Sequence, residues 1–341
     1  MIPSLPRRRE PRVSSGRRRW IPGFAGTTTV ILFAGLAHSP ALRAEDAPAW
    51  LSRAANAARS LNYVGTIVFQ YSGRVETSRL VHLNDNGTEL EKLVNLDGPA
   101  REVIRSHGEV RCYYPDAKIV RIEPRTFRNV FPSLSREQQS ALTEFYEFRK
   151  AEVSRVAGLE AQAYVLEPRD GLRYGHKFWA DRESGLLLKA RLVNEKGDVV
   201  EQFAFSDIVI GSRIDRESVK PTWGTTPPDW QVRQGAPGDA VPHETGWVVT
   251  RLPPGFHKTM EGFRTLRGRR EAVAHLVFSD GLVAVSVFIE PLGGAPGHVA
   301  GTLRQGALNV HSLKLDDRLV TVLGEVPMVT VRQIAQSVAR R

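Results

Sequence analysis

The sequence predicts a mainly β protein of the α+β class, with two antiparallel sheets in two domains. Apolar and polar residues alternate along many short segments of the 341-residue chain, which is the period of a half-buried strand. Short turns such as Asn84-Asp85-Asn86-Gly87 join successive segments, and connections this short are possible only between antiparallel neighbours. Residues 221–242 interrupt the alternation and divide the chain in two.

Residues 45–220 are expected to form the first domain. An amphipathic helix opens it at about 49–60, because Trp50, Leu51 and Ala54 fall on one helical face. Strands are then expected over 63–71, 75–83, 89–96, 109–114, 162–167, 172–180, 186–193 and 199–210.

A second helix is expected to interrupt these strands. Ser135 and Gln138 have the spacing of a capping box, and the helix that they start should run to about Phe148. An antiparallel meander of this length must curl to bury its apolar face. We therefore expect a curved sheet, a half-barrel, with covering helices and a cavity between them, which side chains could also fill.

The second half of the sequence predicts a linker and a smaller domain. Residues 221–242 contain several Pro and Gly without apolar periodicity, so we expect a linker that does not pair in a β-ladder. Residues 243–341 should form an antiparallel sheet closed by a helix after Pro327, whose apolar residues extend to Val338. Its strands are expected over 246–252, 273–278, 282–289, 307–315 and 318–324.

Residues 1–44 have the pattern of an export signal. Arginines at 17–19 precede a short apolar run, and residues 42–44 end in a small side chain suited to cleavage. The run is shorter than the roughly 20 apolar residues of a transmembrane helix. Cleavage there gives a mature chain that starts at Glu45, and residues 39–41 offer an alternative cleavage site. The position of the true start codon stays open. A disordered N-terminus or a membrane anchor is the weaker alternative.

The formal net charge of +10 comes mostly from that export signal. Residues 1–44 hold eight Arg and one acid, so the 47 Lys and Arg against 37 Asp and Glu become 39 against 36 in the mature chain. The net charge of about +3 that remains argues against nucleic acid as a partner. One basic cluster remains as a candidate partner-binding patch, although a solvated loop is the simpler interpretation: Arg264, Arg267, Arg269 and Arg270.

The sequence shows no pattern of catalytic or metal-binding residues. It lacks the nucleophile elbow, the phosphate-binding loop and the dinucleotide fingerprint, and its histidines are scattered singly. Cys112, the one cysteine, is expected to be a buried, inert thiol in a strand. We therefore expect no enzyme activity, no cofactor and no metal.

Short segments spread over residues 48–340 resemble one family in their order and spacing, although none is diagnostic alone. They include Leu96-Asp97-Gly98-Pro99, Cys112-Tyr113, Pro168-Arg169-Asp170, Arg173-Tyr174-Gly175, Pro253-Pro254-Gly255-Phe256, Ser279-Asp280-Gly281-Leu282 and Gly324-Glu325-Val326-Pro327. The chain resembles the MucB/RseB family, periplasmic negative regulators of an envelope-stress sigma factor.

This resemblance implies an N-terminal domain like the lipoprotein carriers LolA and LolB, followed by a smaller C-terminal domain. It also implies binding to the periplasmic segment of a membrane-spanning anti-sigma factor, protection of that segment from the site-one protease, and release by lipid A or another acylated signal. A dimer is among the oligomeric states left open. A lipid or lipoprotein carrier remains the alternative, but it would not need the second domain. A periplasmic enzyme would need convergent polar groups that the sequence does not show.

The alternation of the first domain also predicts which side chains would line its cavity. We assign them to one face of the sheet, with Phe145 contributed by the covering helix. The residues are Ile67, Phe69, Val81, Val94, Phe145, Phe178 and Phe203. A filled core without ligand requires the same alternation, so the sequence leaves both outcomes open.

Overall fold

The computed structural model describes residues 47–341, apart from 125–141, 225–226, 235–240, 266–270 and 293–299. The chain divides into two compact units, Met1–Ala44 and Glu45–Arg341, and the described residues belong to the second. The expected export signal and the expected capping box at Ser135 lie outside the described residues. No helix of the described part has both the length and the apolarity that a membrane span requires.

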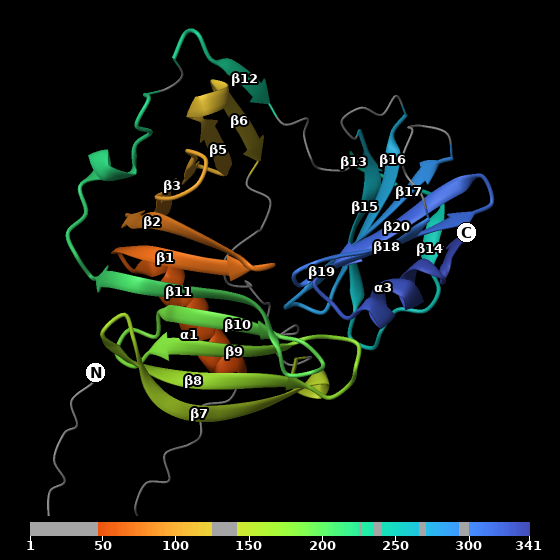
Figure 1. Ribbon diagram of the computed structural model, residues 1–341, viewed down its shortest axis with the longest axis horizontal. Coiled ribbons are helices and arrows are strands. Elements are labelled where there is room, and N and C mark those ends of the chain that lie inside the picture. The colour runs from red at the N-terminus through yellow and green to blue at the C-terminus, as the bar shows by residue number, and fades with distance from the viewer. Residues whose placement is uncertain (1–46, 125–141, 225–226, 235–240, 266–270, 293–299) are drawn as a thin grey trace, which may run out of the picture. The chain divides into compact units, whose positions relative to one another are not determined.

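A twelve-stranded sheet forms the first half of this unit (Figure 1). Its strands lie in the order β12-β6-β5-β4-β3-β2-β1-β11-β10-β9-β8-β7. Their bounds are β1 Tyr63–Tyr71, β2 Arg74–Asp85, β3 Thr88–Asn95, β4 Glu102–Ser106, β5 Glu109–Tyr114, β6 Ile119–Pro124, β7 Tyr146–Val156, β8 Leu159–Pro168, β9 Gly175–Asp181, β10 Leu187–Val193, β11 Val199–Ile210 and β12 Gln231–Gln234. As expected, neighbours along the chain are mostly neighbours in the sheet and pair antiparallel.

Tight turns set the register of these hairpins. In the turn between β2 and β3, Asn86 and Gly87 have φ of +52° and +89°. Positive φ at both central residues is typical of the turn whose twist matches that of two antiparallel strands, and Asn-Gly is the pair that adopts it most easily. The turn therefore places Asp85 opposite Thr88 and fixes every later pair of the hairpin.

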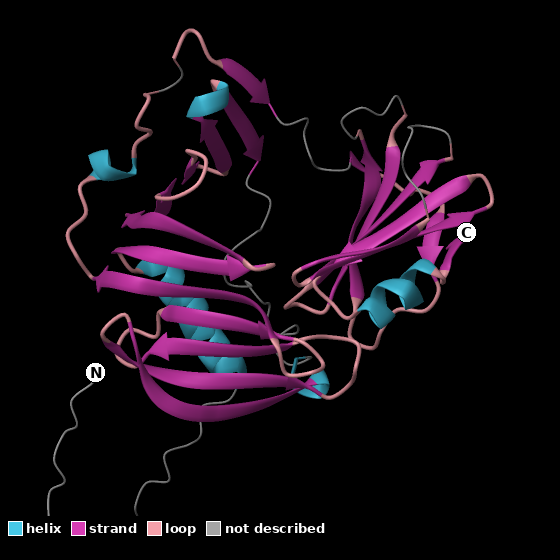
Figure 2. Ribbon diagram, in the orientation of Figure 1, coloured by secondary structure: helices cyan, strands magenta, loops and turns pink. Residues whose placement is uncertain are grey.

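The helix α1 (Ala47–Ser60) covers one face of the sheet, and in Figures 1 and 2 it passes behind β8, β9 and β10. Its apolar side is buried, with Trp50 and Ala54 fully inaccessible and Leu51 nearly so. These side chains pack against Tyr164 of β8 and Phe178 of β9 in one core cluster. The expected amphipathic helix is thus confirmed together with the face that it buries.

A seven-stranded antiparallel sheet forms the second half, in the order β13-β15-β16-β17-β20-β19-β18. Its strands are β13 Val241–Pro242, β15 His257–Arg264, β16 Val273–Ser279, β17 Ala284–Pro291, β18 Gly301–Gln305, β19 Leu308–Leu315 and β20 Arg318–Gly324. The closing helix α3 (Met328–Ala335) packs Val331 and Ile334 into the core of this sheet. The short strands β14 (Trp247–Val249) and β21 (Val338–Arg340) pair separately.

Two expectations about helix ends are wrong. Residues 142–145 are helical, but β7 begins at Tyr146, and Phe148 pairs with Leu166 of β8 rather than ending a helix. Likewise Val338 opens β21 and pairs with Val249. In both places the apolar spacing fits a helix and a strand equally, and pairing with a distant segment decides the outcome. The strands β4, β6, β7, β15 and β18 are further elements that the sequence pattern did not predict.

The expectation that the linker takes part in no ladder is wrong for β12 and also for β13, which pairs antiparallel with β15. Residues Gln231–Gln234 add a strand parallel to β6, with Val232 opposite Val120. Trp223 and Trp230 anchor the segment, because their rings lie 6.1 and 6.4 Å from that of the fully buried Tyr113. Exposed side chains are tolerated in β12 because its backbone supplies the pairing at a sheet edge.

Candidate functional site

Aromatic side chains fill the space between α1 and the large sheet. The Trp50 ring lies 4.4 Å from Tyr164, 5.4 Å from Phe178 and 6.2 Å from Phe148, all in tilted orientation. Such offset contacts add about 0.5–1.5 kcal/mol each beyond simple burial. The face where the sequence predicts a cavity is therefore occupied by Trp50 at its β8–β9 end.

Five of the seven expected cavity residues are on this side of the sheet. Phe178 is buried in the cluster around Trp50, and Phe145 and Phe203 pack against its rim. Ile67 packs against the neighbouring cluster that contains Tyr63 and Phe205. Phe69 lies opposite Phe203 and is half-buried.

Val81 and Val94 are on the opposite face, so their assignment is wrong. Leu80 lies opposite Gly65, on the face of Tyr63 and Ile67, and its neighbour Val81 must therefore point to the other side. Val94 lies opposite Arg79, which shares that other face. There Val81 packs with Leu83, Leu90 and Val219, away from α1.

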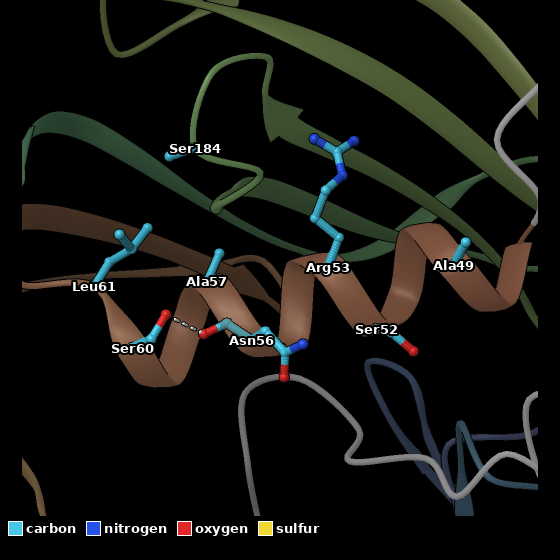
Figure 3. Close-up of a pocket in the computed structure, with 8 residues that line it drawn as sticks. All are labelled: Ala49, Ser52, Arg53, Asn56, Ala57, Ser60, Leu61 and Ser184. Carbon is cyan, nitrogen blue, oxygen red and sulfur yellow. Dashed lines mark hydrogen bonds between the residues drawn. The ribbon is translucent and has the colours of Figure 1, made fainter. Parts of the chain in front are cut away.

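An open hollow of about 470 Å³ lies along the other flank of α1 (Figure 3). Its lining residues are Ala49, Ser52, Arg53, Asn56, Ala57, Ser60, Leu61 and Ser184. Arg53 extends toward the turn that carries Ser184 and donates to the Tyr164 hydroxyl at 3.5 Å. The hollow is shallow and mixed in polarity, and none of the expected cavity residues lines it.

A buried ionic cluster around Arg173 joins loops that connect strands of the two sheets. The guanidinium has no accessible surface, and Nη1 lies 3.0 Å from Oδ2 of Asp280, which is equally inaccessible. Tyr146 at the start of β7 donates its hydroxyl to the same Oδ2 at 3.0 Å. Arg173 Nη2 also donates to the Pro254 carbonyl at 2.6 Å and to Asp170 at 3.1 Å.

Aromatic rings complete the surroundings of this guanidinium. Its Cζ lies 5.0 Å from the Phe145 ring, 5.5 Å from Tyr146 and 5.3 Å from Phe256. A buried charge is tolerated only with partners of this kind, and removing one partner of a buried ion pair typically costs about 3–5 kcal/mol. Both carboxylates and the carbonyl are thus engaged within the protein, and loss of one of them would leave the buried guanidinium with fewer partners.

Two neutral contacts support the same junction. Asn309 of β19 donates to the Tyr174 hydroxyl at 2.9 Å, and Thr330 of α3 donates to the Leu172 carbonyl at 2.7 Å.

Two titratable side chains beside the cluster are neutral near pH 7. Burial raises the pKa of Tyr146, and burial lowers the pKa of the adjacent His176 to about 4.

The expected basic patch is only partly described. Arg264 ends β15 opposite Val273 and is half-buried. Arg267, Arg269 and Arg270 lie outside the described residues. Whether the four side chains gather on one surface therefore stays a prediction.

The described residues contain no group of three or more His, Cys, Asp or Glu that could hold a metal ion. Cys112 lies half-buried in β5, and burial raises the pKa of its thiol, which disfavours the reactive thiolate.

Comparison with known proteins assigns the chain to a family. Residues 46–223 match the family model of the MucB/RseB N-terminal domain, and residues 241–339 match that of the MucB/RseB C-terminal domain. The chain belongs to the MucB/RseB family. The two matches together include every strand of both sheets except β12, which lies between them.

Named members of the MucB/RseB family are similar over most of their length. The sigma factor AlgU regulatory protein MucB of Pseudomonas aeruginosa is 33% identical over 323 residues, covering 92% of this chain and 96% of that protein. The sigma-E factor regulatory protein RseB of Escherichia coli K12 is 26% identical over 283 residues, covering 83% and 87%.

Solved structures extend the similarity to three dimensions. A crystal structure of MucB in complex with the periplasmic part of MucA has a TM-score of 0.69 and 32% identity, covering 87% of this chain and 99% of that one. A second complex, of Pseudomonas aeruginosa MucA and MucB, has a TM-score of 0.68 and 32% identity over the same shares. The relatives are named as regulatory proteins rather than as enzymes.

Proposed function

We propose that this protein is a periplasmic regulator that binds the periplasmic segment of a membrane-spanning anti-sigma factor. The observation that carries the proposal is the similarity, over 99% of its length, to a MucB crystallised with the periplasmic part of MucA. The binding restrains the envelope-stress response because it protects the segment from the protease that starts the cascade. No step of this role requires catalysis, a cofactor or nucleic acid.

Export to the periplasm is part of the proposal. Residues 1–44 direct it and are removed, so the mature chain starts near Glu45. N-terminal sequencing of the protein recovered from a periplasmic fraction tests this, and retention of residues 17–44 in a membrane fraction would contradict it.

The two domains take part together, with residues 45–220 and 243–341 joined by the segment 221–242. Limited proteolysis should cut first within this segment, because β12 pairs on one side only and its side chains are exposed. A first cut within β1–β11 would place the boundary elsewhere.

An acylated ligand is the proposed releasing signal, and it would enter between α1 and the sheet. The half-buried rings of Phe69 and Phe203, with Ile67, Phe145 and Phe178, would line its path. Because Trp50 fills the β8–β9 end of this face, binding requires the Trp50 ring to move.

An acylated fluorophore should therefore quench or shift Trp50 emission, and Trp50→Ala should bind it more tightly than the native protein. Absence of binding by both at high micromolar concentration would remove the lipid from the proposal.

The partner test is direct. The protein should retain the periplasmic segment of its anti-sigma factor in a pull-down from periplasmic extract, identified by mass spectrometry. An eluate that lacks the segment, confirmed by calorimetry with the purified segment, would overturn the proposed function.

The location of the contact is tested by charge reversal in the basic patch. Rim charges mainly set the association rate and its salt dependence. Arg264→Glu with Arg267→Glu should slow association at low salt and change dissociation little. If the variant and the native protein associate at the same rate, both at low and at physiological salt, the patch is not part of the interface, and partner binding is unaffected.

A further inference from the structure

Three cations surround one tryptophan on the sheet face opposite α1. Lys177 and Trp179 lie two residues apart on β9, and Lys189 and Arg191 lie two residues apart on β10. Lys177 is opposite Arg191, and Trp179 is opposite Lys189. The four side chains, named the Trp179 square, therefore project from one face of two adjacent strands.

Core packing on the other face fixes this register. Phe178, between Lys177 and Trp179, is opposite Ala190, and both pack in the cluster around Trp50. A slip of one residue would turn the cations into that apolar core, so the alternation holds all three on the open side.

The square is built around a buried ring. Trp179 is 4% exposed, and the Lys189 Nζ, Lys177 Nζ and Arg191 Cζ lie 4.7, 4.9 and 5.3 Å from its centroid. Strand geometry spaces the corners about 5 Å across and about 7 Å along the strands. Small side chains flank Trp179 and Lys189 in the neighbouring strands, namely Ala163 and Ala204. All three cations keep part of their surface accessible.

The positive charge of the square is only partly balanced. Lys177 has a carboxylate partner, Glu152, at 2.8 Å, whereas Arg191 donates at 2.6 Å to the neutral amide oxygen of Gln202. Lys189 forms no ion pair with any described residue. The pKa of Lys189 is lowered, mainly by burial and further by the nearby positive charges of Arg191 and Lys177. Like charges on paired positions are destabilising, so the square carries a cost that an anion would relieve.

We propose that the Trp179 square is a binding site for a compact phosphate-type dianion. Three cations against one carboxylate leave two positive charges, which matches the −1.5 to −2 of a phosphate monoester near pH 7. A single carboxylate would leave one charge unbalanced. Ammonium and guanidinium groups are the donors that bind phosphate oxygens most strongly. The phosphate comes from a soluble phosphate or from a lipid headgroup, and the site does not depend on the proposed anti-sigma partner.

The first arm of the test is titration calorimetry of the purified protein with inorganic phosphate in a low-salt sulfonate buffer. Lys189→Gln with Arg191→Gln should weaken binding about tenfold or more, because each removes a charged donor. Lys189→Arg should keep it. The matched control is Lys150→Gln with Arg155→Gln, which removes the same charge from exposed positions of β7 and should leave the affinity unchanged.

The second arm identifies the source of the phosphate. Cosedimentation with phosphatidic acid vesicles, but not with phosphatidylcholine vesicles, indicates a headgroup, and binding of free phosphate alone indicates a soluble ligand. Equal phosphate affinity of the native and Lys189→Gln/Arg191→Gln proteins would overturn the proposal. So would tight binding of an acidic peptide without any response to phosphate. Partner binding measured on the same variants should be unchanged, which keeps the two proposals separable.

Discussion

Arg173 and Lys189 are both cations packed against aromatic rings, but their anionic partners differ. Arg173 lies against three rings and is bonded to Asp280, Asp170 and the Pro254 carbonyl, with no accessible surface. Lys189 lies against one ring beside two further cations and forms no ion pair with a described residue.

The difference separates a structural cation from a binding cation. Around Arg173 the cation is fully compensated within the protein, by the buried Asp280 and the partly exposed Asp170, so loss of a partner can only weaken the cluster. In the Trp179 square the compensation is incomplete and the ammonium groups are reachable. Aromatic packing alone thus does not distinguish a structural cation from a binding cation, whereas the number of carboxylates that contact the cation does.

The largest expected effect is on the closed cluster around Arg173. Asp280→Asn keeps the oxygen that accepts from Leu282 and Val283 but removes the charge that faces Arg173. We expect a loss of about 3 kcal/mol in the free energy of unfolding, measured by urea denaturation, because a buried guanidinium loses its inaccessible partner.

The control is Asp207→Asn in the exposed pair with Arg79, which should cost less than about 1 kcal/mol. Arg173→Met combined with Asp280→Ala should be less destabilised than Asp280→Ala alone, because no uncompensated charge remains buried. If Asp280→Asn and Asp207→Asn are equally stable, the buried cluster does not stabilise the fold.

The next prediction concerns His176, which lies beside the same cluster. Its pKa in the folded protein is about 4, below the ordinary 6.5, because burial disfavours the charged ring. The unfolded chain therefore binds this proton first as the pH falls. Stability from the neutral ring is complete above pH 6.5 and is lost between pH 6.5 and 4. His176→Phe should flatten the pH dependence of the urea midpoint in this window. An identical slope in both proteins would contradict the assignment.

The smallest expected effect is on the open square. Lys189→Gln with Arg191→Gln should change the free energy of unfolding by no more than about 0.5 kcal/mol, since relief of like-charge repulsion offsets the lost contacts with Trp179. Urea denaturation without phosphate measures this. A loss of unfolding free energy comparable to that of Asp280→Asn would show that these cations are structural, like Arg173.

One error about the candidate site was avoidable from the sequence. The two-residue turn Ser72-Gly73 places Tyr71 opposite Arg74, and counting back along the hairpin brings Val64 opposite Val81. Val81 therefore cannot share a face with Ile67 and Phe69. Alternation identifies which residues of one strand share a face, but only the turn relates the faces of two strands.

Local patterns in the sequence determined much of the fold. The alternation and turns predicted the antiparallel sheets, the stripe of Trp50, Leu51 and Ala54 predicted the helix that covers one of them, and whole segments indicated the family. These features depend on residues close together in the chain, where period and turn chemistry act directly.

Only the tertiary structure decided which distant segments meet. The addition of β12 to β6 depends on backbone pairing that no side-chain period records. Arg173 and Asp280 are 107 positions apart, and in the sequence each resembles an ordinary loop charge. Trp50 fills the expected cavity only because three strands bring Phe148, Tyr164 and Phe178 around it. Burial and charge compensation arise from long-range packing, so they become visible only when the chain is folded.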